Sequence, residues 1–160
     1  MTKRLALALA ALLAIVPALP MVAAAQSNMM IVPNGDPEMA AAIGKARGAL
    51  PSFWKALEHP GAGEEGFALK VAIKDGKDVE HFWLLDIARD GDKLSGTINN
   101  EPEIVGNVSN GERYEFTDAA ISDWLYMRNG KMVGNETMRP LLKRMPKSQA
   151  EQYRALFETP

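Results

Sequence analysis

The sequence predicts an α+β fold, in which a curled antiparallel sheet of five or six strands follows an N-terminal helix and precedes short C-terminal helices. Apolar residues are spaced as in a helix up to about residue 57. From Gly66 on, apolar and polar residues alternate as in strands, and turn signals separate the short runs. Glycine inside a short strand indicates a bulge or bend, so a sheet curled toward an SH3-like half-barrel is one form that this class can take.

The first helix is expected to begin at Asp36, because Asp36 can cap the helix and Pro37 suits its first position. Its apolar residues recur at steps of three or four, as one stripe of an amphipathic helix requires: Met39, Ile43, Ala46 and Leu50. Pro51 stops or kinks this helix, and the apolar residues of 53–57 continue it for another turn or two.

Strands are expected wherever apolar residues alternate between turn signals. Six runs fit: 66–74, 79–88, 94–99, 114–116, 121–127 and 131–133. Run 79–88 carries apolar residues on both faces and is the expected central strand. Gly96 marks a bulge or bend, and Asn129-Gly130 is a strong hairpin signal. Together the strands predict a meander.

Two short helices are expected at the end of the chain. The first covers 136–144 and is interrupted at Pro140. The second is opened by Ser148 and Glu151, whose spacing is that of a capping box.

Residues 1–25 have the three parts of a cleavable signal peptide in order. Lys3 and Arg4 precede a run of about a dozen apolar residues, and Ala23-Ala24-Ala25 forms a small-residue cleavage site. The run is shorter than a membrane-spanning helix needs, so we expect cleavage after Ala25 and no stable membrane anchor afterwards. A periplasmic or secreted location follows, with a lead-in segment at 26–35 and a single α+β domain at 36–160.

The mature chain is mildly acidic and contains no cysteine. Two of the 18 basic residues and none of the 20 acidic ones lie in 1–25, so 16 positive charges face 20 negative ones and the net charge is −4. An acidic balance argues against nucleic acid as a partner. Without cysteine, the domain depends on packing alone for its stability.

The familiar catalytic and cofactor motifs are missing from the sequence. His59 and His81 are its two histidines, and no H-x-x-x-H pair is present, so no metal site is predicted. A serine nucleophile elbow and the glycine-rich loops for phosphate or dinucleotide are also absent, so no cofactor is predicted.

His81 is the weak candidate for a general base. Glu80 is its neighbour along a strand and points to the opposite face, so a partner would have to come from another strand, with Asp86 or Asp123 as orienting carboxylates. The alternative is a packed histidine that hydrogen-bonds a backbone carbonyl.

The weak ligand-binding candidates are Glu80, Trp83, Asn100, Trp124, Asn135 and Arg139. Asn100 could present its amide to a ligand, or could form the turn before Pro102. Trp124 could be a stacking platform, or it could fill the core while Asp123 caps local backbone. Arg139 could hold an anionic group, or could pair with Asp123 or Glu80 inside the protein.

Five stretches of the sequence together resemble the bacterial domain-of-unknown-function family numbered 2314. They are 80–83, 96–102, 111–112, 121–124 and 134–139, and residues 42–47 with Phe53 fit the helical lead-in of the family. Glu112 departs from the family pattern, which has Asp at that position. The resemblance implies no established activity and no catalytic residue. It does imply that Glu80, His81, Trp83, Asn100, Asp123, Trp124, Asn135 and Arg139 belong to one recurring pattern.

The sequence favours a non-catalytic binding or interaction domain of the cell envelope, with Trp83, Trp124 and Arg139 near a shallow pocket. Its partner would be a small molecule, a peptide or an envelope protein. One alternative is a hydrolase or lyase in which His81 and Asp123 act as base and orienting group. The other is a structural envelope protein with no ligand site.

Overall fold

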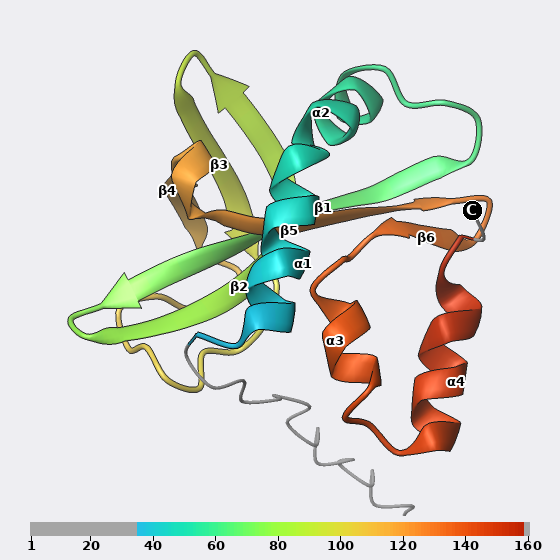
Figure 1. The fold of residues 1–160 in the computed structure, drawn as a ribbon. Helices are drawn as coiled ribbons and strands as arrows, with labels where there is room; N and C mark the ends of the chain where they lie inside the picture. Colours follow the sequence, from blue (N-terminus) through green and yellow to red (C-terminus); the bar gives the residue numbers. More distant parts are fainter. Residues whose placement is uncertain (1–34, 159–160) are drawn as a thin grey trace, which may run out of the picture.

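A computed structural model describes residues 35–158, in which one open antiparallel sheet is flanked by helices (Figure 1). The helices are α1 (Pro37–Gly48), α2 (Leu50–Glu58), the 3-10 turn η1 (Asp118–Ala120), α3 (Met138–Leu142) and α4 (Lys147–Leu156). The strands are β1 (Glu64–Asp75), β2 (Asp78–Asp90), β3 (Lys93–Ile98), β4 (Arg113–Phe116), β5 (Ile121–Arg128) and β6 (Lys131–Gly134). The predicted α+β class is confirmed. The expected signal peptide, and the lead-in up to residue 34, lie outside the described residues.

The strand order is β4-β3-β2-β1-β5-β6, and every neighbouring pair is antiparallel. The predicted meander is therefore wrong at one connection, because the chain crosses back through η1 after β4 and places β5 beside β1. Alternation along a strand reports which face is buried, but it does not report which strands are neighbours. The sheet ends at β4 and β6 and does not close into a barrel.

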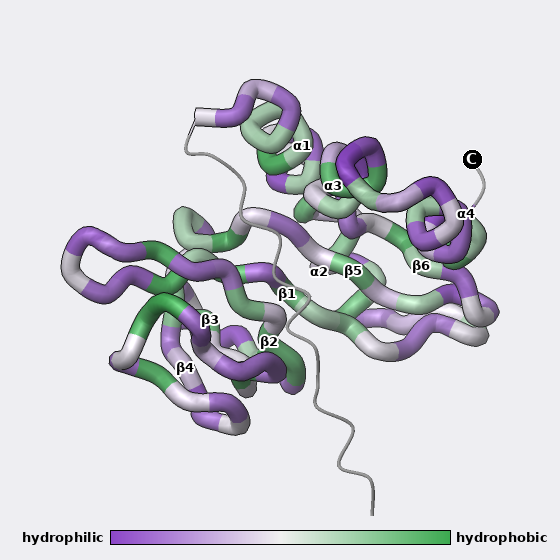
Figure 2. Tube along the Cα trace, turned by 90° about the horizontal axis from the view of Figure 1, so that it is seen from below, coloured by the Kyte–Doolittle hydropathy of each residue, from purple (hydrophilic) through white to green (hydrophobic). Residues whose placement is uncertain are grey.

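The main core lies between one face of the sheet and the helices α1 and α2. Its centre is Phe53 of α2, whose ring contacts Phe67 and Trp124 on the sheet. Trp124 also donates its indole N–H to the carbonyl of Ala46 in α1, at 2.8 Å. Asp36 caps α1 by accepting from the backbone N–H of Met39, as predicted. Figure 2 shows hydrophobic residues interspersed with hydrophilic ones along the helices and strands.

A bulge in β2 moves one predicted side chain to the other face. The β2–β3 register shifts between Leu85 and Ala88, and Asp86 adopts a left-handed backbone conformation with φ of 51°. The alternation placed Ile87 on the face of Trp83, but the extra residue returns Ile87 to the main core. Gly96 lies opposite this bulge, where a Cβ would come within 2.8 Å of Ile87 Cδ1.

The C-terminal helices form a second, smaller core on the other side of β5 and β6 from α2 (Figure 1). Leu142, Ala150 and Phe157 pack there against Met132 of β6, and a short bridge joins Met132 to Phe157. The predicted capping box is wrong: α4 begins at Lys147, so Ser148 lies inside the helix, and the cap residue Pro146 makes no side-chain cap bond.

Gly134 holds the turn from β6 toward α3 against the ring of Trp124. Its φ is 82°, and a Cβ would collide with the Trp124 carbonyl oxygen and lie 2.7 Å from its ring. We expect Gly134→Ala to lower the free energy of unfolding by about 2 kcal/mol, measured by urea denaturation. Gly130→Ala is the control, since it has a similar φ of 74° but open space, and should cost about 1 kcal/mol. Equal losses would contradict the proposed contact.

Candidate functional site

A row of polar side chains crosses the middle of the sheet on the face opposite the main core. Lys70 of β1 is in register with Trp83 of β2 on one side and with Asp123 of β5 on the other. Side chains in register on neighbouring strands point to the same face, so these three form one row. His81 is in register with Ala72, and the small alanine leaves room for His81 to reach Ser122 across β1.

Asp123 is fully buried and is the acceptor at the centre of this cluster. Its carboxylate accepts from the backbone N–H groups of Trp124 at 2.8 Å, Glu136 at 3.2 Å and Thr137 at 2.7 Å. The Thr137 hydroxyl donates a fourth bond, also at 2.7 Å. Burial raises the pKa of Asp123, and these hydrogen bonds and the charge of Lys70 oppose that rise. Asp123 therefore ties the start of α3 to β5, which agrees with the interpretation that it caps local backbone.

Lys70 carries a positive charge into this cluster without a carboxylate in direct contact. Its Nζ donates to the Thr137 hydroxyl at 3.2 Å and lies 5.4 Å from the centre of the Trp83 ring. Among residues 35–158, no carboxylate lies within ion-pair distance of Nζ. Desolvation lowers the pKa of Lys70, and the charge of Asp123 opposes this only in part.

His81 is linked to a hydroxyl and not to a carboxylate. Its Nδ1 lies 2.8 Å from Ser122 Oγ, and Ser122 in turn donates to the carbonyl of Lys70 at 3.2 Å. Ser122 is only 4% exposed, so its oxygen is not presented to a substrate. Desolvation lowers the pKa of His81, and the positive charge of Lys70 lowers it further.

The lowered pKa of His81 predicts a loss of stability in acid. The unfolded chain takes up a proton on His81 as the pH falls below 6.5, whereas the folded chain resists protonation until a lower pH. Stability should fall through that window by a few tenths of a kcal/mol, since the ring is partly open to solvent. Melting temperatures from pH 7.5 to pH 5 should show a shallower slope for His81→Gln, and an unchanged slope would contradict this account.

Glu80 serves the fold on the opposite face of β2. Its carboxylate is buried and accepts from the backbone N–H groups of Glu103, Ile104 and Val105, at 2.9 to 3.1 Å. This anchors the long connection between β3 and β4 beside the core.

Removing the Glu80 carboxylate should loosen that connection. We expect Glu80→Ala to lower the free energy of unfolding by about 2 kcal/mol, because buried donors lose their acceptor. Glu80→Gln keeps one acceptor oxygen and should lose less. Limited proteolysis should cut Glu80→Ala within 99–112 before any other segment, and cutting elsewhere first would contradict this role.

The remaining candidates do not join the polar row. Asn100 accepts from the backbone N–H of Trp83 and extends the sheet. Trp124 is 5% exposed on the core face, opposite Trp83, so the expected pocket between them does not form. Asn135 takes a left-handed turn conformation and contacts Met132. Arg139 pairs with Glu136 and lies over the ring of Phe157, so the expected pairing with Asp123 or Glu80 is wrong.

Three residues that make contacts in the cluster were not among the candidates predicted from the sequence: Lys70, Ser122 and Thr137. Lys70 alternates with alanines in β1, which is typical of an ordinary solvent-facing position. One signal was present. Ala68 and Ala72 flank Lys70 on its own face, and such small residues leave space for longer side chains from neighbouring strands.

Within the described part of the chain, no three histidine or carboxylate side chains gather closely enough to hold a metal ion. None of the helices there is long and apolar enough to cross a membrane. The fold and its polar row thus define an α+β domain with a cluster of charged and aromatic side chains on the sheet face opposite α1 and α2, next to the start of α3.

The chain belongs to the family described as "Uncharacterized protein conserved in bacteria (DUF2314)", whose model matches residues 36–157. This confirms the resemblance found in the sequence. The chain is 38% identical to the uncharacterized protein YegJ of Escherichia coli K12 over 117 residues, which cover 73% of this chain and 75% of YegJ.

A second relative is longer than this chain. The chain is 34% identical to the putative ankyrin repeat protein NMB1133/NMB1171 of Neisseria meningitidis serogroup B over 84 residues, 52% of this chain and 33% of that protein. No solved structure is significantly similar.

Proposed function

We propose that this protein is an exported, non-catalytic binding domain of the cell envelope, which binds a small anionic group on the sheet face opposite α1 and α2. The site consists of Lys70, His81 and Trp83. The anionic group is a carboxylate or a phosphate, on a small molecule or on a peptide.

The unpaired charge of Lys70 is the observation that carries this proposal. A desolvated ammonium group is costly unless an opposite charge compensates it. Lys70 has one acceptor among the described residues, the neutral hydroxyl of Thr137, although an ammonium group has three donors. A bound anion would add to the partial compensation that Asp123 gives and would supply further acceptors.

The two side chains beside Lys70 suit the same ligand. Trp83 is half-buried next to Lys70 and offers a flat apolar surface. Because Ser122 donates its proton to the Lys70 carbonyl, Nδ1 is the donor in the bond between His81 and Ser122. His81 can therefore donate from Nε2 only in its protonated form, which a bound anion would favour. Asp123 is already satisfied by its four hydrogen bonds, so it fixes the frame of the site without competing for the ligand.

The hydrolase or lyase alternative receives less support from this geometry. A histidine base needs an orienting partner and an accessible reacting group. Ser122 holds the Nδ1 of His81, and among the described residues no carboxylate is hydrogen-bonded to His81.

Export is the second part of the proposal and rests on the pattern of residues 1–25. Fractionation of cells that express the full chain should place the protein outside the cytoplasm. N-terminal sequencing should then read Gln26 first. Recovery of an intact N-terminus in the cytoplasm would contradict export and leave the binding site untouched.

A thermal-shift screen tests binding. The mature protein is screened against anionic envelope metabolites, acidic peptides and charged glycans, together with neutral analogues of each. We expect hits among the anions that Lys70→Met abolishes and Lys74→Met retains, since Lys74 is exposed on the same strand. Hits that survive Lys70→Met, or a screen in which no anion stabilises the protein, would contradict the proposal.

A further inference from the structure

The sheet is split between its two central strands. The β1–β2 ladder ends at the pair Leu69 and Leu84. Beyond this pair, β1 continues along β5 only, and β2 continues along β3 only. Figure 1 shows the two halves of the sheet diverging there, with α2 between them. The split leaves two strand edges facing each other inside the sheet, at 64–68 and 85–87, and on the second of them the carbonyl of Asp86 accepts from Arg113 at 2.7 Å.

A shallow groove of about 340 Å³ occupies this split. It is lined by Leu57 of α2, by Gly66 and Phe67 of β1, and by Leu85, Asp86 and Ile87 of β2. Both strands have a register shift at the same level, with Gly66 and Asp86 at positive φ, so the chain keeps the split open on each side. Four of the five lining side chains are apolar, and a groove of this size accommodates one or two side chains.

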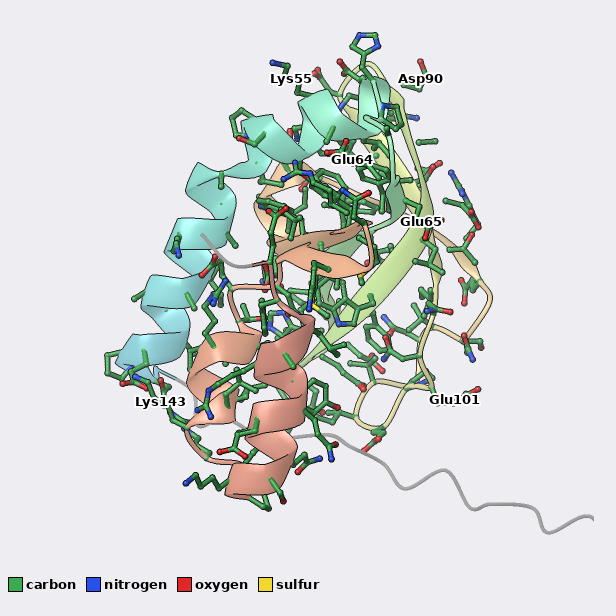
Figure 3. All side chains as sticks on the ribbon, turned by 90° about the vertical axis from the view of Figure 1, so that its right-hand side faces the viewer. Lys55, Glu64, Glu65, Asp90, Glu101 and Lys143 are labelled. Atoms are coloured by element: carbon green, nitrogen blue, oxygen red, sulfur yellow. The ribbon has the colours of Figure 1, made fainter. Side chains whose placement is uncertain are left out.

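The rim of the groove is acidic. Asp86 lines it, Glu58 and Glu65 adjoin lining residues, and Asp90 follows on β2; all four are exposed. Within residues 35–158, none of these carboxylates makes an ion pair. In Figure 3, Glu65 and Asp90 lie on the side of the molecule away from α1, with Lys55 at the upper end of α2. Two arginines lie near the rim. Arg89 is engaged by Asp118 and the ring of Trp54. Arg113 donates to the backbone carbonyl of Asp86 and to the Ser95 hydroxyl.

We propose that this split is a docking site for an extended segment of a partner protein, in which lysine or arginine residues flank an apolar residue. Strand edges supply main-chain hydrogen bonds to an added strand, as in other cases of strand addition. The apolar lining accepts one side chain of the segment, and the four carboxylates attract its basic residues. The groove shares no residue with the Lys70 cluster, so this proposal stands independently of anion binding.

Peptide selection tests the site directly. The protein purified from cells that express the full chain is panned against a phage-displayed library of random peptides of about twelve residues, long enough to form one strand. We expect enriched sequences in which basic residues alternate with apolar ones. Hydrogen exchange of the complex with a synthetic enriched peptide should slow the amides of 64–68 and 85–87.

Paired variants then locate the binding. The double variant Glu65→Gln/Asp86→Asn removes two rim charges and keeps a residue that tolerates positive φ at position 86. This double variant should bind the enriched peptide with about tenfold lower affinity, measured by fluorescence polarisation. The control Asp78→Asn/Glu115→Gln removes two exposed carboxylates elsewhere and should change affinity by less than about twofold. The proposal is overturned if no peptide is enriched, if the enriched peptides lack basic residues, if both double variants lose affinity equally, or if protection falls outside the split.

Discussion

Replacing Asp123 with alanine is expected to lower the free energy of unfolding by about 4 kcal/mol, because buried donors then lose their acceptor. Three of these donors are backbone N–H groups of Trp124, Glu136 and Thr137, so the loss reaches both β5 and the start of α3. Water cannot readily replace the carboxylate, since Asp123 is fully buried. Urea denaturation of the purified protein measures the change.

The matched control is Asp123→Asn. Its side chain has nearly the same shape and keeps one acceptor oxygen, but its amide group faces donors, so we expect a loss of about 2 kcal/mol. An alanine variant that unfolds within about 1 kcal/mol of the wild type would contradict the role of Asp123 as the central acceptor.

Replacing Lys70 with methionine should weaken ligand binding and strengthen the fold at the same time. Loss of the charge should lower the affinity for an anionic ligand by about a hundredfold, which is the loss expected when a desolvated charged contact is removed. The free energy of unfolding at pH 7 should rise by about 1 kcal/mol, since methionine removes the desolvated charge. A purely structural lysine would instead destabilise the protein when replaced.

The sign of this effect fixes its pH dependence. The pKa of Lys70 is lower in the folded chain than in the unfolded one. Below the folded pKa, Lys70 is protonated in both states, and burying its charge lowers the free energy of unfolding by the full amount. That penalty fades as the pH rises toward 10.5, the ordinary lysine value. The stability gain of Lys70→Met should fade in parallel. A gain that is constant with pH would show that the charge is not its cause.

The local pattern of the sequence predicted much of the fold. The cap at Asp36, the alternation in β1 and the hairpin at Asn129 and Gly130 each depend on neighbouring residues, and each is found. The return of β5 to β1 and the bulge at Asp86 were not predicted. The position of β5 depends on which edge of the sheet the chain reaches after β4, and local alternation does not report this. The bulge adds one residue to β2, so that the side chains after it point to the opposite face from the one predicted.

The candidate site was predicted less well than the fold, because its residues meet through contacts between strands and not through the local sequence pattern. His81 and Asp123 were recognised, but Lys70, which lies between them, was not. The cluster draws on three strands and the start of α3, and its members are brought together by strand register. Trp124 is buried in the core by its parity in β5, which is the second of the two alternatives that the sequence left open for it and rules out a stacking platform beside Trp83.

Nuclear magnetic resonance of the Lys70 side chain tests anion binding most directly. The ¹³Cε signal of Lys70 is followed during a titration with benzoate, which offers a carboxylate to Lys70 and a ring to Trp83. The proposed site predicts a saturable shift of this signal, a rise of the Lys70 pKa in the complex, and no saturable shift with benzyl alcohol as the neutral analogue. A Lys70 signal that does not respond to benzoate, or that responds equally to benzyl alcohol, would contradict the anion site.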